Sequence, residues 1–290
     1  MANRLTPKRH AVGARRHVRA FAQAVLGPVS RRIRREIQWH TRGVNFRVDR
    51  CEPGDFPYVA ATHATPLIRS LPGVDQQMQR NKVVNLRIAA QRLDGVMLGP
   101  GIRLSFWREV GKPSRHRGFV DGMVLDHGKV AVGVGGGLCQ MTNLLYWMTL
   151  QTPLSVAERW RHSYDVFPDT GRTQPFGSGA TCAWPLLDLQ IENRTSVPYR
   201  LCVTVTDTDL VGSWTAAEPL DVRYEIEERN HRMTHEGPGM YVRRNELWRL
   251  EYGAYDTLLS EEMVVENCAL LTYAPVLPPT PEEASTKDSL

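Results

Sequence analysis

The sequence predicts one α+β domain in which a cysteine-bearing helix packs on a mainly antiparallel sheet built from the C-terminal half of the chain. Three observations predict this fold. Of the 290 residues, 42% are hydrophobic and 23% are charged, which suffices for a packed core and excludes wholesale disorder. An apolar helical stretch, GLCQMTNLLYWMTL, follows a glycine run and ends before Thr152-Pro153. Short runs of alternating apolar and polar residues return from Leu154 onward.

Residues 1–50 form a basic arm. They carry thirteen Lys and Arg against only two acidic residues, whereas the whole chain has a formal net charge of +5, so the body is mildly acidic. A nucleic-acid-binding body carries its own basic surface, and we therefore expect no nucleic-acid partner. Val29, Ile33 and Ile37 recur four residues apart among arginines, which predicts a basic amphipathic helix. Two interpretations stay open: a solvated, partly disordered arm, and a contact with an anionic membrane surface.

The remaining chain divides into a body over residues 51–275 and a Pro-rich tail over 276–290 that we expect to be disordered. Ala20–Gly27 is too short and too polar for the apolar core of an export signal, and no run is long enough to span a membrane. The five cysteines are odd in number and contain no CxxC pair. We therefore expect a cytoplasmic protein, peripheral at the inner membrane face if the arm binds lipid, with no cofactor and no metal.

Two elements are predicted before the glycine run. Residues 76–93 are rich in strong helix formers and end at Asp94-Gly95, which predicts a helix. After a Gly-Pro-Gly turn, the alternation of apolar and polar residues over 102–106 predicts a strand. Residues 119–134 are expected to be extended and turn-rich.

The second half of the chain is predicted to be rich in strands. Alternating patterns occur over residues 187–192, 201–206 and 222–226, separated by Pro, Gly and Asn. The pattern over 156–167 predicts a further strand with Trp160, His162 and Tyr164 on one face.

The stretch Gly133–Leu150 carries the candidate chemistry. It lacks the Gly-Lys-Ser/Thr of a phosphate loop, and its glycines permit a close backbone approach just before the helix. Cys139 falls in the first turn of that helix, beside the apolar stripe, where the helix N-terminus stabilises a thiolate. His162 would act as its base, and Asp188, or alternatively Asp165, would orient the imidazole. A cysteine opening a helix, then a histidine and a carboxylate on the following strands, is the order used by papain-like and transglutaminase-like thiol enzymes.

Further residues are predicted to line the same site. Backbone N–H groups near Gln140 and Met141 would hold an oxyanion, and Gly177-Ser178-Gly179 would form a tight loop nearby. The predicted binding residues are Gly135, Gly136, Gly137, Gln140, Asn143 and Ser178. Two other interpretations compete with catalysis: Cys139 as a buried structural thiol, and a metal site of Cys139, His162 and Cys182, which we do not expect.

Several long blocks of unusual composition occur in order: NKVVNLRIAAQRLDG, SFWREVGKP, and GGGLCQMTNLLYWMTLQTPLSVAERWRHSYDVFPDTGRTQPFGSGAT, followed by DLQIEN and TDTDLVGSW. With these blocks, residues 55–275 closely resemble the VanW family. The resemblance implies an accessory role in glycopeptide (vancomycin-type) resistance, and therefore a cell-wall context. It assigns no reaction.

Two functions follow from these observations. The first is a cysteine-dependent acyl-transfer enzyme or hydrolase, of amidase, peptidase or acyltransferase type, acting on wall-precursor peptides through Cys139, His162 and Asp188. The alternative is a non-catalytic binding protein for a wall precursor or glycopeptide, whose cleft would be walled by tryptophans. The tryptophans concerned are Trp147, Trp160 and Trp184.

Overall fold

The computed structural model describes residues 29–40, 43–68, 75–126, 129–162, 164–165 and 174–273. The tail 276–290 and most of the arm lie outside these ranges. Contacts divide the chain into two units, Met1–Val44 and Asn45–Leu290. The second unit therefore begins six residues before the boundary that the sequence predicts. Within the described ranges, none of the helices combines the length and apolar character needed to cross a membrane.

In the first unit, residues 29–39 are helical. This segment lies within the arm, where the spacing of its apolar residues predicts a helix. Val29, Ile33 and Ile37 are all exposed. The helix therefore presents these three apolar residues to solvent.

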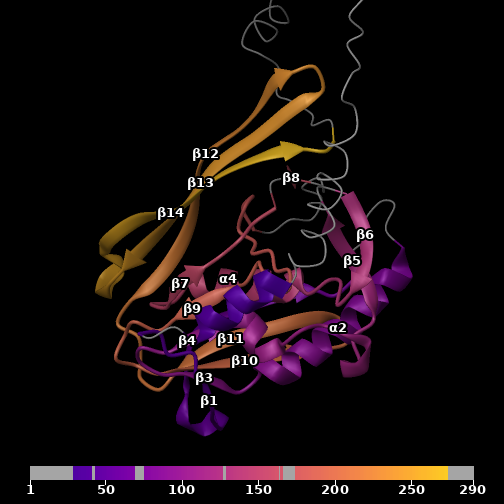
Figure 1. Ribbon diagram of the computed structural model, residues 1–290. Coiled ribbons are helices and arrows are strands. Elements are labelled where there is room, and N and C mark those ends of the chain that lie inside the picture. Colours follow the sequence, from indigo (N-terminus) through magenta and orange to yellow (C-terminus); the bar gives the residue numbers. More distant parts are fainter. Residues whose placement is uncertain are drawn as a thin grey trace, which may run out of the picture. The chain divides into compact units, whose positions relative to one another are not determined.

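A five-stranded antiparallel sheet forms the centre of the second unit (Figure 1). Leu201 pairs with Trp214 and Val203 pairs with Gly212, so the buried positions of two neighbouring strands share one face. The predicted antiparallel α+β fold is confirmed, but three of the five strands precede residue 100, so the sheet is not built from the C-terminal half alone. In sheet order, the strands are β1 (Asp49–Arg50), β3 (Val96–Leu98), β10 (Tyr199–Val205), β11 (Asp209–Ala216) and β2 (Tyr58–Pro66).

Two helices pack on this sheet: α2 (Gln76–Leu93) contacts β10, and α4 (Cys139–Leu150) contacts β11 and β2. The side chain of Asp75 accepts a hydrogen bond from the N–H of Gln77 (2.7 Å) and so caps α2. Both predicted helices are confirmed. Gly212 of β11 lets α4 approach closely, because a Cβ there would lie only 2.9 Å from Leu144 Cδ2.

Several short elements complete the second unit. Ser105 ends β4 and Phe106 begins α3, so the predicted strand over 102–106 is too long at its C-terminal end. The reason is capping, because the Ser105 hydroxyl accepts a hydrogen bond from the N–H of Arg108 (3.2 Å). The elements are α3 (Phe106–Val110), the hairpin β5 (Asp121–Asp126) and β6 (Lys129–Val134), the small sheet β4 (Arg103–Ser105), β9 (Gln190–Glu192) and β7 (Ser155–Glu158), and the 3-10 turns at Pro53–Asp55, Arg115–Arg117 and Ala254–Asp256.

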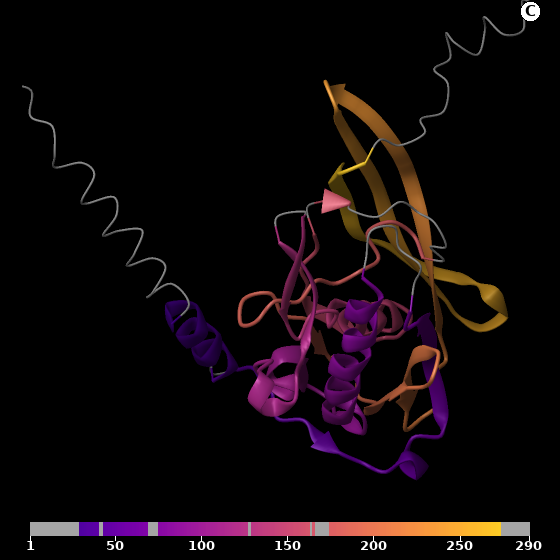
Figure 2. The same ribbon diagram turned by 90° about the vertical axis from the view of Figure 1, so that its right-hand side faces the viewer.

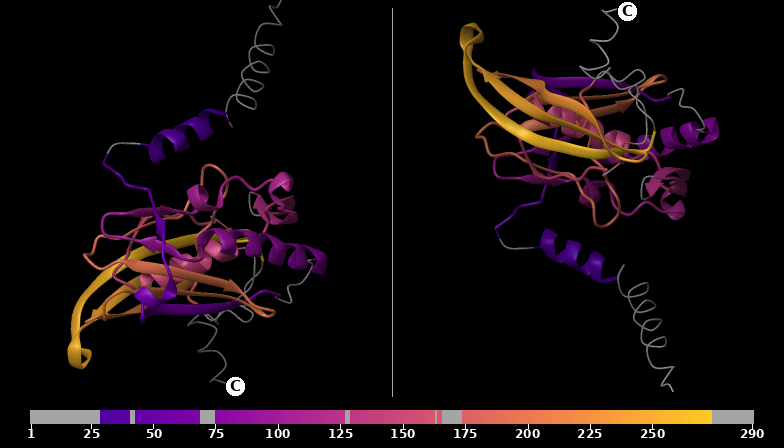
Figure 3. Two further views of the ribbon diagram at one scale, coloured as in Figure 1. Left: turned by 90° about the horizontal axis from the view of Figure 1, so that it is seen from below. Right: turned by 90° about the horizontal axis from the view of Figure 1, so that it is seen from above.

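Three long strands, β12 (Arg223–Gly237), β13 (Met240–Tyr252) and β14 (Leu258–Leu271), form a second antiparallel sheet. Figures 2 and 3 show them running side by side as a curved ribbon, coloured orange to yellow. The short strand β8 (Tyr164–Asp165) joins β14 in parallel. A buried ion pair between Asp165 and Arg243 of β13 (3.3 Å) fixes this end of the sheet.

Candidate functional site

The glycine run before α4 is held by packing and by one buried amide. A Cβ on Gly136 would lie 2.1 Å from the carbonyl carbon of Gly122, so these two backbones touch. The side chain of Asn85 donates to the carbonyls of Gly136 (2.9 Å) and Val120 (3.1 Å), and it accepts from the N–H of Val120 (2.9 Å). These contacts fix the point at which α4 begins. Ligand binding by Gly135, Gly136 and Gly137 stays a prediction.

Cys139 is the first residue of α4, and it lies against Cys182 and His162. The two sulfurs are 3.9 Å apart, and the Cys139 thiol also lies 3.7 Å from the carbonyl oxygen of Cys182. His162 is a near neighbour that lowers the pKa of the Cys139 thiol. Cys139 is half-buried, whereas Cys182 is buried. The structure therefore brings together the predicted nucleophile and its predicted base, with a second thiol beside them.

The surroundings shift the pKa values of the two thiols in opposite directions. The pKa of Cys139 lies well below its ordinary value, chiefly because the Cys182 side chain hydrogen-bonds to it, with further contributions from His162 and the Cys182 backbone that together outweigh burial. Burial, followed by the neighbouring Cys139, holds the pKa of Cys182 well above its ordinary value. Proton loss therefore occurs first at Cys139, and the Cys182 thiol donates to the resulting thiolate.

The loop that carries Cys182 is tied to α4 and to Arg159. Asn143 Oδ1 accepts a hydrogen bond from the N–H of Ala180 (2.7 Å), and the Thr142 hydroxyl donates to the carbonyl of Ala180 (2.6 Å). Arg159 donates to the carbonyls of Gly177 and Gly179. Residues 177–179 thus form the predicted tight loop near the cysteine. Asn143, predicted as a binding residue, serves here to hold the loop.

Two other predicted binding residues have structural partners. The Ser178 hydroxyl donates to the carbonyl of Pro175 (2.7 Å) and is buried. The Gln140 side chain donates to Thr65 Oγ1 (2.8 Å) and to the carbonyl of Pro66 (3.0 Å), which connects α4 to β2. A direct role of Ser178 or Gln140 toward a ligand stays a prediction.

His162 lies between β7 and β8 rather than on a strand, so the predicted continuous strand over 156–167 is wrong. The strand ends at Glu158 because Arg159 turns toward the carbonyls of the 177–179 loop. Residues 163 and 166–173 lie outside the described ranges. His162 therefore reaches Cys139 from a connecting segment.

The two carboxylates proposed to orient His162 have other partners. Asp188, fully buried, accepts from the Ser105 hydroxyl (2.6 Å) and from the N–H of Trp107 (3.0 Å), at the start of α3. Asp165 forms the buried ion pair with Arg243 described above. The orienting role of Asp188 stays a prediction.

The backbone donors at the start of α4 are partly occupied. The N–H groups of Gln140 and Met141 donate to the carbonyls of Gly137 (3.1 Å) and Leu138 (3.0 Å). Among the described residues, the N–H of Cys139 itself has no hydrogen-bond partner. It is the donor best placed for a charge that develops next to the sulfur.

No group of three His, Cys, Asp or Glu side chains suited to a metal ion occurs among the described residues. Sequence reasoning named Cys182 only for such a metal site and missed Arg159 and Thr142. No local sequence pattern identifies Arg159 and Thr142 as site residues, because the carbonyls that they bind belong to the 177–182 loop, which follows later in the chain.

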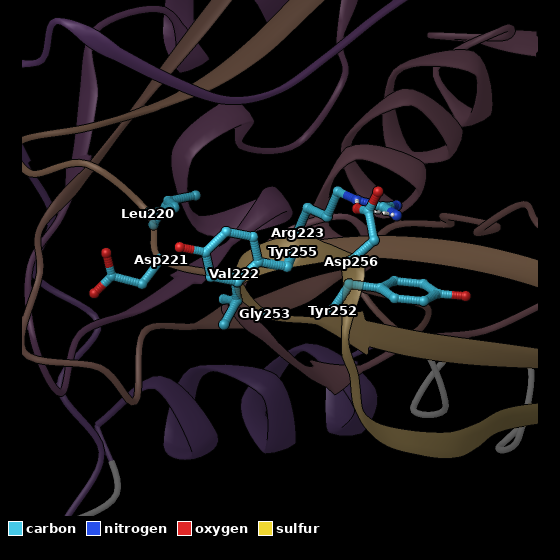
Figure 4. Close-up of a pocket in the computed structure, with 8 residues that line it drawn as sticks. All are labelled: Leu220, Asp221, Val222, Arg223, Tyr252, Gly253, Tyr255 and Asp256. Carbon is cyan, nitrogen blue, oxygen red and sulfur yellow. Dashed lines mark hydrogen bonds and ion pairs between the residues drawn. The ribbon is translucent and has the colours of Figure 1, made fainter.

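Two concave regions are lined by residues of the second unit. One, with a volume of ≈ 390 Å³, is lined by Tyr146 of α4, Arg159, and residues of β7, β13 and β14. The Arg159 guanidinium also lies over the ring of Tyr146, 4.6 Å from the ring centroid. The other, ≈ 330 Å³, is shown in Figure 4, and Arg223 pairs there with Asp256 (2.9 Å). None of the described residues that line either region is a predicted site residue.

The lowered pKa of Cys139 leads to a test with iodoacetamide. Because only the thiolate reacts, Cys139 should stay reactive to a lower pH than an ordinary thiol, of which a few per cent is thiolate at pH 7. We expect labelling of Cys139 at pH 7 to be about tenfold faster than that of Cys268, although Cys268 is the more exposed residue. Peptide mapping after timed quenching measures both rates. Labelling of Cys139 only in urea would show that the thiol is inaccessible and inert.

Comparisons with known proteins give a consistent result. The family model described as "VanW like protein" matches residues 81–215. The chain is similar to the Vancomycin B-type resistance protein VanW of Enterococcus faecalis, with 34% identity over 185 residues that cover 64% of this chain and 67% of that protein. It is also similar to the uncharacterized protein YoaR of Bacillus subtilis, with 25% identity over 138 residues, 44% of each chain. No solved structure matches, so the papain-like or transglutaminase-like fold stays a prediction.

Proposed function

The chain belongs to the VanW family, and on this basis we propose that it is an accessory protein of vancomycin-type resistance that transfers or hydrolyses acyl groups of wall-precursor peptides. The observation that carries the proposal is the placement of Cys139 at the first turn of α4, in contact with Cys182 and beside His162, which together lower the pKa of its thiol. A thiol with a lowered pKa beside an imidazole is the arrangement that a nucleophilic cysteine requires.

The proposed reaction runs through an acyl-enzyme. The Cys139 thiolate attacks a peptide or amide carbonyl of the precursor, and His162 carries the thiol proton to the leaving amine. The carbonyl carbon is then bound to sulfur as a thioester, and water or a second amine releases it. Water as the acceptor gives hydrolysis, and an amine gives acyl transfer.

The surroundings of Cys139 support this sequence of steps. The N–H of Cys139 donates to the oxygen of the tetrahedral intermediate, and the start of the α4 helix adds its partial positive charge. The Cys182 thiol, 3.9 Å away, stabilises the attacking thiolate before the substrate arrives. Each of these groups acts on the charge that forms at or near the sulfur.

We propose a peptide carrying a carboxylate as the substrate, with the carboxylate in the ≈ 390 Å³ cavity, which Cys139 and His162 do not line. Arg159 lines it, and the hydrogen bonds of Arg159 described above go to neutral carbonyls rather than to a carboxylate. Arg249, which also lines it, pairs with Glu262 (2.8 Å). The cation of Arg159 is therefore the group proposed to attract the substrate carboxylate.

Mass spectrometry of the intact protein and of its peptides tests the proposal. The protein is incubated with a soluble disaccharide-peptide wall precursor, quenched in acid and digested. We expect an acyl adduct on Cys139 that hydroxylamine removes, as it removes thioesters. The Cys268→Ser variant should form the same adduct, and the Cys139→Ser variant should form none.

The same samples distinguish the alternative function. Saturable binding of the precursor by calorimetry without any adduct would favour the non-catalytic binding protein. In that case the tryptophans would be tested next; Trp184 packs edge-on against Trp107 with ring centroids 5.8 Å apart. If the samples show neither an adduct nor binding, the proposal that wall-precursor peptides are the substrate class is overturned.

The proposal includes a location at the inner face of the membrane, in the cytoplasm. The five unpaired cysteines suit a reducing compartment. The helical residues 29–39 combine three exposed apolar side chains with four arginines, which suits an anionic lipid surface.

Vesicle sedimentation tests this location. The full chain is expected to bind vesicles containing phosphatidylglycerol at low salt and to dissociate as salt rises, because the attraction is screened. A variant with Val29, Ile33 and Ile37 replaced by serine should lose most binding while keeping its net charge. Equal binding by this variant would contradict insertion of the apolar face, and binding to uncharged vesicles would contradict the electrostatic part.

A further inference from the structure

Cys139 and Cys182 bring two sulfur atoms to within 3.9 Å of each other, from elements far apart in the sequence. The cysteines have different exposures. Cys139 is half-buried, whereas Cys182 is buried. A separation of 3.9 Å is a van der Waals contact, and a disulfide requires an approach of about 2 Å more.

The backbone on both sides of this contact is held in place. Thr142 and Asn143 of α4 bind both polar groups of Ala180, two residues before Cys182. Because the two elements are tied together next to the sulfurs, the thiols stay in contact without a large rearrangement.

We propose that Cys139 and Cys182 form a reversible oxidation site, at which hydrogen peroxide oxidises Cys139 and Cys182 then closes a disulfide. The substrate class is a hydroperoxide, and the disulfide blocks the Cys139 sulfur. The inference concerns thiol chemistry alone and does not require the acyl transfer proposed above.

The chemistry balances in two steps. The Cys139 thiolate attacks one oxygen of hydrogen peroxide, so that an S–O bond forms, the O–O bond breaks, and with one proton the products are a sulfenic acid and water. The Cys182 thiol then attacks the sulfur of Cys139; an S–S bond forms, the S–O bond breaks, and the hydroxide leaves as water with the Cys182 proton. Sulfur is oxidised and peroxide is reduced. A dithiol reductant returns both thiols.

The pKa directions agree with this division of roles. Peroxide reacts with thiolates, and the pKa of Cys139 is the lowered one. Cys182, whose pKa is raised by burial, stays a thiol until the sulfenic acid forms beside it. Cys139 is therefore the oxidised residue and Cys182 the resolving residue.

The other cysteines provide contrasts within the same chain. Cys51 and Cys202 share Arg200, which donates to the carbonyl of Cys51 (3.2 Å) and to the sulfur of Cys202. Burial raises the pKa of Cys51, which disfavours its thiolate. Cys268 is exposed. These three cysteines are expected to react with peroxide more slowly than Cys139.

The test is a peroxide titration of the full chain, read by peptide mapping without reduction. We expect a cross-linked pair of peptides containing Cys139 and Cys182, lighter by two hydrogen atoms than the two peptides together and removed by dithiothreitol. In Cys182→Ser and Cys182→Ala, Cys139 should instead be trapped by dimedone as a sulfenic acid, more slowly in Cys182→Ala because alanine removes the hydrogen bond that lowers the pKa of Cys139. With excess peroxide, those variants should pass to sulfinic acid that the reductant does not reverse.

The outcomes are decisive in either direction. Absence of the cross-linked peptides from the wild-type chain, while Cys139 accumulates as sulfinic acid, would overturn the proposal without depending on any variant. Linkage of Cys139 to Cys268, or between two chains, would overturn the assignment of Cys182. Loss of acyl transfer with intact disulfide formation would count against the proposed function only.

Discussion

Replacing Cys139 with serine is expected to abolish the acyl adduct and to lower turnover of a wall-precursor peptide by about 10³-fold or more. The serine hydroxyl stays protonated near neutral pH, so neither His162 nor the start of α4 can supply an anion of comparable reactivity. Steady-state product release and the intact mass measure the two effects. The melting temperature should change little, because serine is nearly isosteric with cysteine and Cys139 is only half-buried.

His162→Ala should lower turnover by roughly 10²–10⁴-fold through loss of the proton carrier. It should also raise the pKa of Cys139, because His162 favours the thiolate. The pH at which iodoacetamide labelling is half-maximal should therefore move upward. The double variant should be no slower than Cys139→Ser alone, since residues of one catalytic unit fail together. Additive losses, or an unchanged labelling profile, would contradict the pair.

Asp188→Asn separates an orienting role from a structural one. An asparagine has only one acceptor oxygen for the three donors Ser105, Trp107 and Gln190, so the capping of α3 weakens by about 1–3 kcal/mol. If Asp188 also orients His162, both the turnover of the folded protein and the melting temperature fall. If Asp188 only caps α3, the melting temperature falls and the turnover of the folded protein is unchanged. The measurement is the turnover per folded molecule, compared between the wild type and Asp188→Asn.

The helices of the central layer are predictable from local signals. The N-terminal cap at Asp75 and the Asp94-Gly95 end define α2, and the glycine run followed by an apolar stretch defines α4. These signals lie within a few residues of each helix end. A single sequence is sufficient to read them.

Elements defined by distant partners are not predictable in this way. Phe106 starts α3 because Asp188, far along the chain, accepts the N–H of Trp107. β2 has little apolar contrast in its sequence, YVAATHATP, and it exists because it pairs with β11 along its length. Both depend on contacts that no local pattern encodes.

The candidate site shows the same division. The position of Cys139 at a helix start follows from neighbouring residues. The role of Cys182 depends on a loop whose carbonyls bind Arg159 and whose amide binds Asn143. The sequence therefore predicts the proposed nucleophile and base, while the second thiol becomes visible only when the loop is placed.

The second large effect is expected at the glycine contact that positions α4. In Gly136→Ala the new Cβ would lie 2.1 Å from the carbonyl carbon and 2.3 Å from the carbonyl oxygen of Gly122. Backbone atoms on the facing strand cannot rotate away as a side chain does, so the two segments must separate. We expect a loss of about 3 kcal/mol or more in the free energy of unfolding. For a body of this size, that corresponds to a fall of at least about 6 °C in melting temperature.

The same displacement is expected to affect both the stability of the protein and the reactivity of Cys139. Separation of Gly136 from Gly122 also strains the hydrogen bond from Asn85 to the Gly136 carbonyl, and Cys139 follows three residues later. Iodoacetamide labelling of Cys139 at pH 7 should therefore slow in the variant even at temperatures where it remains folded. Gly54→Ala is the matched control, because a Cβ there meets nothing within 4 Å, and its stability should change by no more than about 0.5 kcal/mol. A Gly136→Ala protein with the same melting temperature as the wild type would contradict the backbone contact. It would also contradict the argument that the glycine run positions the cysteine.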